Sequence, residues 1–435
     1  MGKNNFRKIA TITLFESAVQ WYCFLLYGTA AGTVFHKVFF SQTGNGTTAL
    51  ILSYMSFAIG YIAGPFGAIF FGHIGDRKGR KVTMYASLLM MGISTSIIGI
   101  LPPAASAGVG VVIVLQLMRL AQCFGRGGTW GGGILMAYEN VPENKRSFYA
   151  AIPQIGLPIG FGLSSILIAV PTLLLPEDIF FTWGWRIPFL AAIILTVIVI
   201  RQKGEMMETE DYKKAQAKLE AEEAEGKKHK VGFIPMVKGY WKTLFLGCGT
   251  RWVDGTFYNI FIVWILSYCI NWLGMPLIQT YIITIIACIF KIPFTLFGGW
   301  CAQKLGNTRT FVIGALASAV LSIPTLKVIE LSKGNLAITI IGIVLGWSIA
   351  YNLIWAVISS LWSSYFETEV RYSGISFVYH VPSFLVAGMV PTICTLLINY
   401  GKGDTIYVGI YSTVVALISA ACALALKARH DRGEK

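Results

Sequence analysis

The chain has 435 residues, of which 55% are hydrophobic and only 13% carry a charge, whereas soluble domains carry charge on roughly 25% of their residues. So few charges cannot cover a surface in water, which excludes a water-soluble globular protein. A net charge of +14 would suggest nucleic-acid binding in a soluble protein. Here it reflects Lys and Arg concentrated in the loops on one side of a membrane, so no nucleic-acid partner is expected.

Long apolar runs follow one another along the chain, and each can cross a bilayer as a helix of ~20 residues. Backbone groups in lipid must form their hydrogen bonds within the segment, so each run predicts a helix. The sequence therefore predicts an all-α, multi-pass protein of the bacterial inner membrane, with twelve transmembrane helices and both termini in the cytoplasm. The predicted spans are residues 12–36, 49–72, 82–101, 109–138, 148–173, 184–201, 244–270, 277–300, 310–330, 335–362, 373–398 and 405–427.

One segment between the sixth and seventh spans is highly charged. Asp, Glu, Lys and Arg make up more than half of residues 201–230, and Glu208–Gly226 has the composition of a solvated helix. The segment divides the chain into an N-terminal six-helix bundle (1–201), a cytoplasmic linker (202–243) and a C-terminal six-helix bundle (244–435). This arrangement is typical of transporters whose halves rock about a central site.

The loop after the second span has the sequence GHIGDRKGRK, residues Gly72–Lys81. Its pattern, GxxxDRxGR[KR], resembles the hallmark loop of the major facilitator superfamily. A degraded copy, GWCAQKLGN, follows the eighth span at Gly299–Asn307, which indicates an ancestral duplication. The resemblance implies the major facilitator fold and transport by alternating access.

Further segments resemble the metabolite:proton symporter family: QWYCF (20–24), RLAQ (119–122), GGTWGG (127–132), QIG (154–156), WGWRIPF (183–189) and VRYSG (370–374). That resemblance implies import of a small polar metabolite, an organic anion or zwitterion, with protons. The family carries acidic residues where this chain has Gln20, Cys23 and Thr129, and an arginine where it has Gly64. Since carboxylates are the natural proton carriers, proton-independent uniport or exchange is the alternative.

Ionisable side chains inside spans are costly and are candidates for function. Arg119 and Arg126 are seven residues apart in the fourth span, so they share a helix face about 10 Å apart, and guanidinium groups suit planar oxyanions. Alternatively, one of them pairs with Glu16 and holds helices together. Glu16, Gln20 and Cys23 share a face of the first span, where Glu16 is a candidate proton carrier or a balancing charge.

The second half has its own buried charges. Arg251 and Asp254 form an i,i+3 pair in the seventh span, and a self-neutralised structural pair is favoured over a role in substrate binding or coupling. Lys291, in the eighth span, is expected to bind an anion or to pair with Asp254. Further candidates for lining the cavity are Gln154, Tyr258, Tyr351, Asn352 and His380. For the aromatic residues the alternative is helix packing or an interfacial belt, and for His380 it is a hydrogen bond between helices.

A second group of residues is expected to form a gate. The family resemblance implies that Asp76 meets the N-terminal end of the eleventh span, where the helix dipole favours an anion. Arg80, Glu139 and Arg146 are expected to form cytoplasmic salt bridges that stabilise the outward-facing state. Simple topological anchoring by these charges is the alternative.

A secondary transporter is therefore the leading interpretation. A membrane enzyme is the first rival, and no HExxH, GxSxG or P-loop motif supports it. A non-transporting solute receptor on the same fold is the second. The eight cysteines show no ligand spacing, so neither a disulfide nor a metal site is predicted. We expect no cofactor, protons as the coupling ion, a small molecule and the bilayer as partners, and a monomer.

Overall fold

The computed structural model describes residues 3–78, 80–139, 145–202, 233–367 and 370–434, with side chains described in 11–71, 74, 82–129, 145–201, 237–367 and 370–434. The elements in these ranges are helical, and no β-strand occurs among them, which confirms the all-α class. The principal helices are α1 (Lys3–Ala30), α3 (Gly46–Lys78), α4 (Arg80–Ile100), α6 (Gly110–Glu139), α8 (Gly156–Leu174), α10 (Arg186–Gln202), α12 (Phe233–Asn259), α14 (Leu277–Leu305), α15 (Asn307–Leu331), α17 (Asn352–Tyr365), α18 (Arg371–His380), α19 (Val390–Tyr400) and α20 (Ile406–Asp431).

Shorter segments connect or continue these helices. They are α2 (His36–Val38), α5 (Ala104–Ala107), α7 (Arg146–Ala150), α9 (Glu177–Ile179), α13 (Ile265–Asn271), α16 (Leu336–Ile343), the 3₁₀ turns η2 (Ser41–Thr43) and η4 (Pro153–Ile155), and the π segments η1 (Ala31–Phe35), η5 (Phe180–Gly184), η7 (Ile260–Trp264), η8 (Val344–Ala350) and η9 (Phe384–Gly388).

Each predicted span coincides with a helical stretch. Within the described ranges, nine stretches are long and apolar enough to cross a membrane, and they correspond to the second, third, fifth to tenth and twelfth predicted spans. The first span is α1 with η1, the fourth is α6, and the eleventh is α18 with η9 and α19. The order of apolar runs along the sequence therefore predicts the order of helices in the structure.

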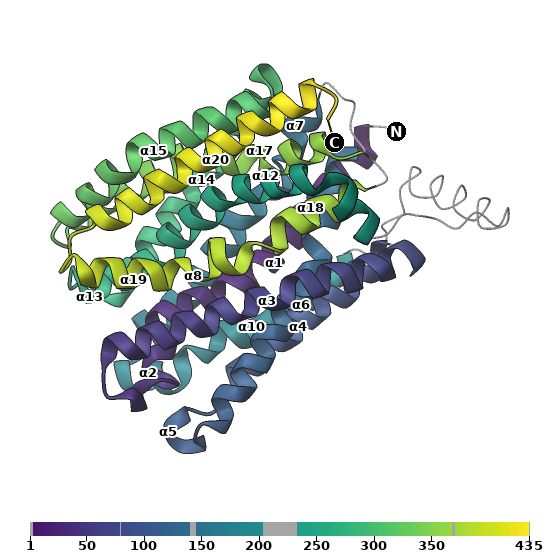
Figure 1. The fold of residues 1–435 in the computed structure, drawn as a ribbon. Helices are drawn as coiled ribbons and strands as arrows, with labels where there is room; N and C mark the ends of the chain where they lie inside the picture. The colour runs from purple at the N-terminus through teal and green to yellow at the C-terminus, as the bar shows by residue number, and fades with distance from the viewer. Residues whose placement is uncertain (1–2, 79, 140–144, 203–232, 368–369, 435) are drawn as a thin grey trace.

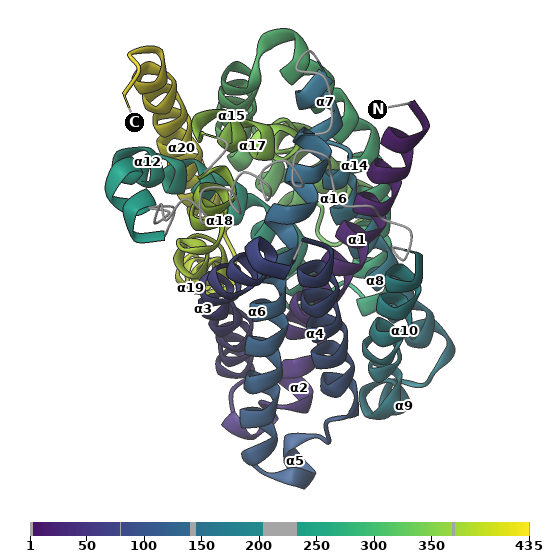
Figure 2. The same cartoon turned by 90° about the vertical axis from the view of Figure 1, so that its right-hand side faces the viewer.

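The helices form two groups that face each other (Figures 1 and 2). Helices α1 to α10, purple to blue, lie on one side, except the short helix α7, which lies beside α14. Helices α12 to α20, teal to yellow, lie on the other side. The start of α1 and the end of α20 lie at the same end of the molecule (Figure 1), as an even number of crossings requires. We call this the inner end, because the sequence predicts it in the cytoplasm, and the opposite end the outer end.

The predicted domain boundaries stay a prediction. Most of the linker, including its expected helix Glu208–Gly226, lies outside the described residues. What the structure does give is the interface between the two groups, where α14 packs along α8 and η1 contacts η7.

Several π segments interrupt the spans at or near this interface, and such insertions often mark functional sites because the extra residue changes the direction of the side chains that follow. The segment η8 ends at Ala350, directly before Tyr351 and Asn352. Both of these side chains are completely buried, and both belong to the site described next.

Candidate functional site

Arg119 lies inside the first half, in a cage of aromatic rings. Its side chain is 0% exposed, and its guanidinium carbon lies 4.4 to 4.6 Å from three ring centroids. The rings are those of Phe24, Tyr27 and Phe57. The group donates hydrogen bonds to the Gln122 side-chain oxygen and, at 3.4 Å, to the Phe57 carbonyl. Gly60 makes room for it, since a Cβ there would lie 2.6 Å from Arg119 Nε.

Arg126 shares the helix face of Arg119 but reaches the other half of the molecule. Its guanidinium carbon lies 3.8 Å from the Phe24 ring centroid and 4.6 Å from that of Trp21. One nitrogen donates to the hydroxyl of Tyr379, on α18 of the second half. Its Nε is buried and has no hydrogen-bond partner within the described part of the chain. Arg126 therefore connects the halves and keeps one donor available.

On the other side of Tyr379 lies the ion pair predicted from the sequence. Arg251 donates to Asp254, one helical turn along α12, and both side chains are 0% exposed. Asp254 also accepts a hydrogen bond from Tyr351. The Tyr379 ring centroid is 4.4 Å from the Arg251 guanidinium carbon, so one ring contacts a guanidinium group from each half. Nε and Nη2 of Arg251 have no hydrogen-bond partner among the described residues.

Lys291, on α14, is also 0% exposed. Its Nζ donates to the side-chain oxygen of Asn352 at 3.1 Å and to the Trp347 carbonyl at 3.4 Å. The same nitrogen lies 4.6 Å from the Trp347 ring centroid and 4.4 Å from that of Tyr351. Among the described residues Lys291 forms no direct ion pair with Asp254, one of the two partners considered for it. Tyr351 contacts Lys291 through its ring and Asp254 through its hydroxyl.

The remaining predicted residues are also buried. Glu16 and Gln20 are each 2% exposed on α1. Gln154 and Trp355 join the halves by two hydrogen bonds: the Gln154 amide donates to the Trp355 carbonyl at 3.3 Å, and the indole donates to the Gln154 carbonyl at 3.0 Å. Tyr258 hydrogen-bonds to Tyr61 across the same interface. The structure thus brings Arg126, Arg251, Asp254 and Tyr258 together and leaves Arg119 deeper in the first half.

Sequence reasoning missed three residues of this centre, Tyr61, Tyr379 and Trp355. An aromatic residue in a span is ordinarily assigned to packing or to the membrane interface. Tyr379 is adjacent to His380, which was among the candidates, but no spacing rule shows that its ring contacts arginines from both halves.

The predicted gate is described only in part. The side chains of Asp76, Arg80 and Glu139 lie outside the described residues, so their salt bridges stay a prediction. Arg146 begins the short helix α7, which packs against α14. Next to it, a Cβ on Gly299 would lie 2.7 Å from the Ala151 side chain, so the two halves are in close contact at the inner end.

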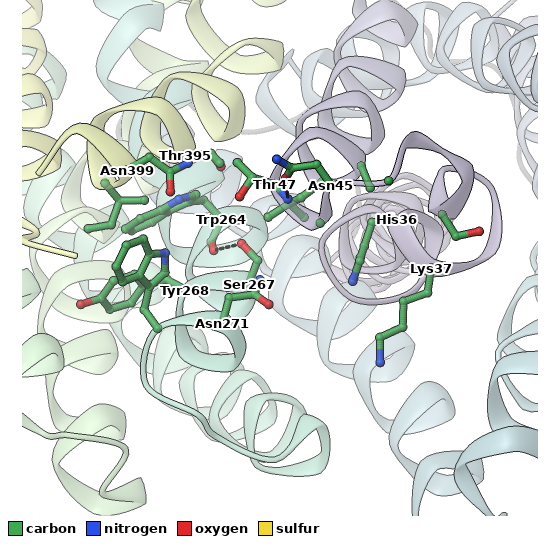
Figure 3. A pocket seen from close by; sticks show the side chains of 17 residues that line it. His36, Lys37, Asn45, Thr47, Trp264, Ser267, Tyr268, Asn271, Thr395 and Asn399 are labelled. Atoms are coloured by element: carbon green, nitrogen blue, oxygen red, sulfur yellow. Dashed lines mark hydrogen bonds between the residues drawn. The ribbon is translucent and has the colours of Figure 1, made fainter. Parts of the chain in front are cut away.

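A cavity of about 740 Å³ lies between the halves at the outer end. Figure 3 shows its polar lining, with Asn45 and Thr47 from the first half and Asn271 and Asn399 from the second. Below it the halves meet again, since the Tyr54 hydroxyl donates to Ser267 at 2.6 Å and Tyr281 donates to Thr33 at 3.2 Å. These two contacts join the halves near the outer cavity, and Ser267 is itself part of the cavity lining.

Comparisons with known proteins agree with this architecture. The model of the Major Facilitator Superfamily matches residues 11–391. An inner membrane metabolite transport protein of Escherichia coli, YhjE, is 33% identical over 98% of this chain and 96% of its own. The shikimate transporter of E. coli is 31% identical over 97% and 94%, and the proline/betaine transporter of Salmonella typhimurium is 27% identical over 98% and 84%.

A solved structure of the proton:xylose symporter XylE shares the fold, with a TM-score of 0.75 at 15% identity over 98% of this chain and 95% of that one. These matches confirm the resemblance found in the sequence and the location in the cell membrane. The chain belongs to the major facilitator superfamily and is a multi-pass membrane transporter of metabolites, not an enzyme.

Proposed function

We propose that this chain moves a small organic anion bearing a carboxylate across the membrane together with protons, by alternating access between its two halves. The names of similar proteins support transport in general: one relative is a shikimate transporter, another a proline/betaine transporter, and a symporter of xylose and protons has the same fold. Because those substrates differ, the choice of an anion rests on the charges of this chain.

An excess of buried positive charge carries the proposal. Away from the helix ends, the described side chains include four buried cations and two buried carboxylates. The cations are Arg119, Arg126, Arg251 and Lys291, and the carboxylates are Glu16 and Asp254. Buried charges without counter-charges are costly, and a bound anion supplies the missing negative charge. A zwitterion would add an ammonium group to a site that is already positive, so an anion fits better.

The geometry indicates where such an anion binds. Arg126 and Arg251 both contact Tyr379, and together they have three buried donor nitrogens without hydrogen bonds to the described residues. Leaving a buried donor unpaired costs about 1–3 kcal/mol. A planar carboxylate accepts two parallel hydrogen bonds from a guanidinium group. A carboxylate bound beside Tyr379 would therefore satisfy donors from both halves at once.

Contacts between the two halves on the outer and inner sides of Tyr379 are weak enough to open in turn. On the outer side the halves are held by the hydrogen bonds Tyr54–Ser267 and Tyr281–Thr33, and on the inner side by Gln154–Trp355. Each contributes about 0.5–1.5 kcal/mol. A ligand that binds the open and closed states with affinities differing by a few kcal/mol can shift such a balance.

Proton-independent exchange of the same anion is the second candidate function. It is favoured by Gln20 and Cys23 on α1, which carry no carboxylate at the positions where related transporters have one. Asp254, for its part, is already held by Arg251 and Tyr351.

Uptake into proteoliposomes tests the proposal. Labelled monocarboxylates, zwitterions and neutral polyols would be offered to wild type, Arg126→Gln, and Arg309→Gln as a matched control at an exposed position on α15. We expect uptake of a carboxylate that Arg126→Gln abolishes and the control retains. Uptake of only neutral or zwitterionic solutes, unaffected by Arg126→Gln, would contradict the anion assignment. Binding without uptake would show a receptor.

A further inference from the structure

Among the four buried cations, Lys291 is the one whose charge can switch. An arginine side chain stays protonated in proteins, whereas a lysine loses its proton when the environment disfavours the charge. Arg119, Arg126 and Arg251 are therefore fixed positive charges. Lys291 is therefore a potential proton carrier in a chain that has Gln20, Cys23 and Thr129 where the family it resembles carries acidic residues.

The surroundings of Lys291 suit both of its protonation states. Its two hydrogen-bond partners, the Asn352 side-chain oxygen and the Trp347 carbonyl, are neutral. Asn352 is fixed in this orientation because Thr295 donates to its oxygen at 3.0 Å and its own amide donates to the Lys291 carbonyl at 2.8 Å. Within the described ranges no carboxylate lies within 4.0 Å of the Lys291 nitrogen. An ammonium group here lacks a direct counter-ion.

The ionisable groups that face Lys291 come from three elements. Cys288 lies one turn earlier on α14, and Asp254 on α12 interacts with Lys291 electrostatically. Tyr351, which follows η8, presents its ring to the nitrogen. The neighbouring segments α8, η8 and α16 carry no ionisable residue. Asp254 is therefore the facing carboxylate, and Arg251 already neutralises it.

We propose that Lys291 carries the coupled proton and that the carboxylate of the substrate is its counter-ion, an inference that rests on the proposed anion transport. A proton from the outer side adds to the lone pair of Nζ, and a carboxylate enters the site. The charges of the ammonium and the carboxylate cancel, so the loaded transporter carries no additional net charge. After reorientation the carboxylate leaves to the inner side, the ammonium gives its proton to the cytoplasm, and the neutral amine returns with the empty transporter.

Thermodynamic linkage makes this mechanism concentrative. Protonation of Lys291 favours carboxylate binding, and carboxylate binding favours protonation by the same factor. One proton moves with one monocarboxylate, so a pH difference of one unit, worth about 1.36 kcal/mol, supports at most about tenfold accumulation. The coupled step moves no net charge, so that ratio does not depend on membrane potential.

Three variants test the assignment. Lys291→Arg keeps the charge but cannot release the proton, and Lys291→Gln has no charge. Lys304→Arg is an exposed control on the same helix. Exchange of labelled carboxylate between equal concentrations reports an intact transport path. Accumulation under a pH difference of one unit reports coupling. We expect wild type and Lys304→Arg to accumulate about tenfold, and Lys291→Arg to exchange the carboxylate without accumulating it.

Proton uptake on binding in detergent gives an independent measurement that does not require transport. We expect about one proton per carboxylate bound by wild type at a pH where the empty site is deprotonated, and none for Lys291→Gln. Full accumulation by Lys291→Arg, or unchanged proton uptake by Lys291→Gln, would overturn the assignment and point to Glu16. Exchange without accumulation in wild type would also overturn it while preserving anion transport. Absence of carboxylate exchange in wild type would contradict the proposed function itself.

Discussion

Replacing Asp254 by asparagine tests whether the buried pair on α12 stabilises the structure. The substitution keeps the shape of the side chain but removes its charge, and it replaces by an amide nitrogen one of the two oxygens that accept from Arg251 and Tyr351. Removing one partner of a buried ion pair costs about 3–5 kcal/mol, because the other charge is left uncompensated. With an unfolding entropy of roughly 2.1 cal/mol/K per residue over 435 residues, the thermal midpoint should fall by about 3–5 °C.

Differential scanning fluorimetry in one detergent, with size exclusion before and after, measures this shift. The double variant Arg251→Gln/Asp254→Asn removes both charges, so we expect it to regain most of the lost midpoint. A single variant as stable as wild type would refute the reasoning, because it would mean that Arg251 is already compensated by another group. A double variant as unstable as the single one would show that Tyr351–Asp254, rather than the ion pair, carries the stability.

Four further predictions follow from individual contacts. Gly60→Ala places a Cβ against Arg119, so overpacking should cost about 1–3 kcal/mol of stability and lower the thermal midpoint. Gly239→Ala, whose Cβ would lie in open space, should leave the midpoint unchanged. Tyr379→Phe removes the acceptor of Arg126 and should weaken carboxylate binding measured by titration. Asn271→Cys, at the exposed rim of the outer cavity, should react with an impermeant maleimide from the outer side. The reaction should be faster when Tyr54→Phe is added, because that substitution removes the hydrogen bond to Ser267. Hydrogen bonds from Lys327 and from the backbone N–H of Ile406 lower the pKa of Asp404 in the outer loop. A carboxylate with a lowered pKa stabilises the fold at pH values above the ordinary carboxyl pKa of about 3.9, and this contribution is lost as the pH falls below that value. The difference in thermal midpoint between wild type and Asp404→Asn should therefore shrink in acid.

The helices were predictable because one strong physical constraint governs them. A segment in lipid must be apolar and must satisfy its own backbone, so the positions of the spans can be read directly from hydropathy. Helix α6 was predicted as well, because the rest of its sequence is mostly apolar despite Arg119 and Arg126. The π segments were not predictable, since no local sequence signal distinguishes η7 or η8 from the helix around it.

The candidate site was predictable in its charges and in the local pair of Arg251 and Asp254, but not in the contacts between helices distant in sequence. Burial of an ionisable residue follows from its position in a span, so Arg126, Asp254 and Lys291 could be identified from the sequence. Their partners depend on how helices distant in sequence approach one another. The contact between Arg126 and Tyr379 joins residues 253 positions apart, and nothing local to either residue predicts it.

The two halves hold their charges differently, and this difference supports the division of roles proposed above. In the first half Arg119 and Arg126 are surrounded mainly by aromatic faces, which stabilise a cation by about 2 kcal/mol or more when desolvated and cannot exchange protons with it. In the second half Lys291, a cation that can lose its proton, is connected to Asp254 through Tyr351. An anion bound at Tyr379 would contact Arg126, a fixed positive charge of the first half, and would lie on the side of Lys291 in the second half. If that division holds, substitutions of Arg126 should change affinity at every pH, whereas substitutions of Lys291 should change how affinity depends on pH.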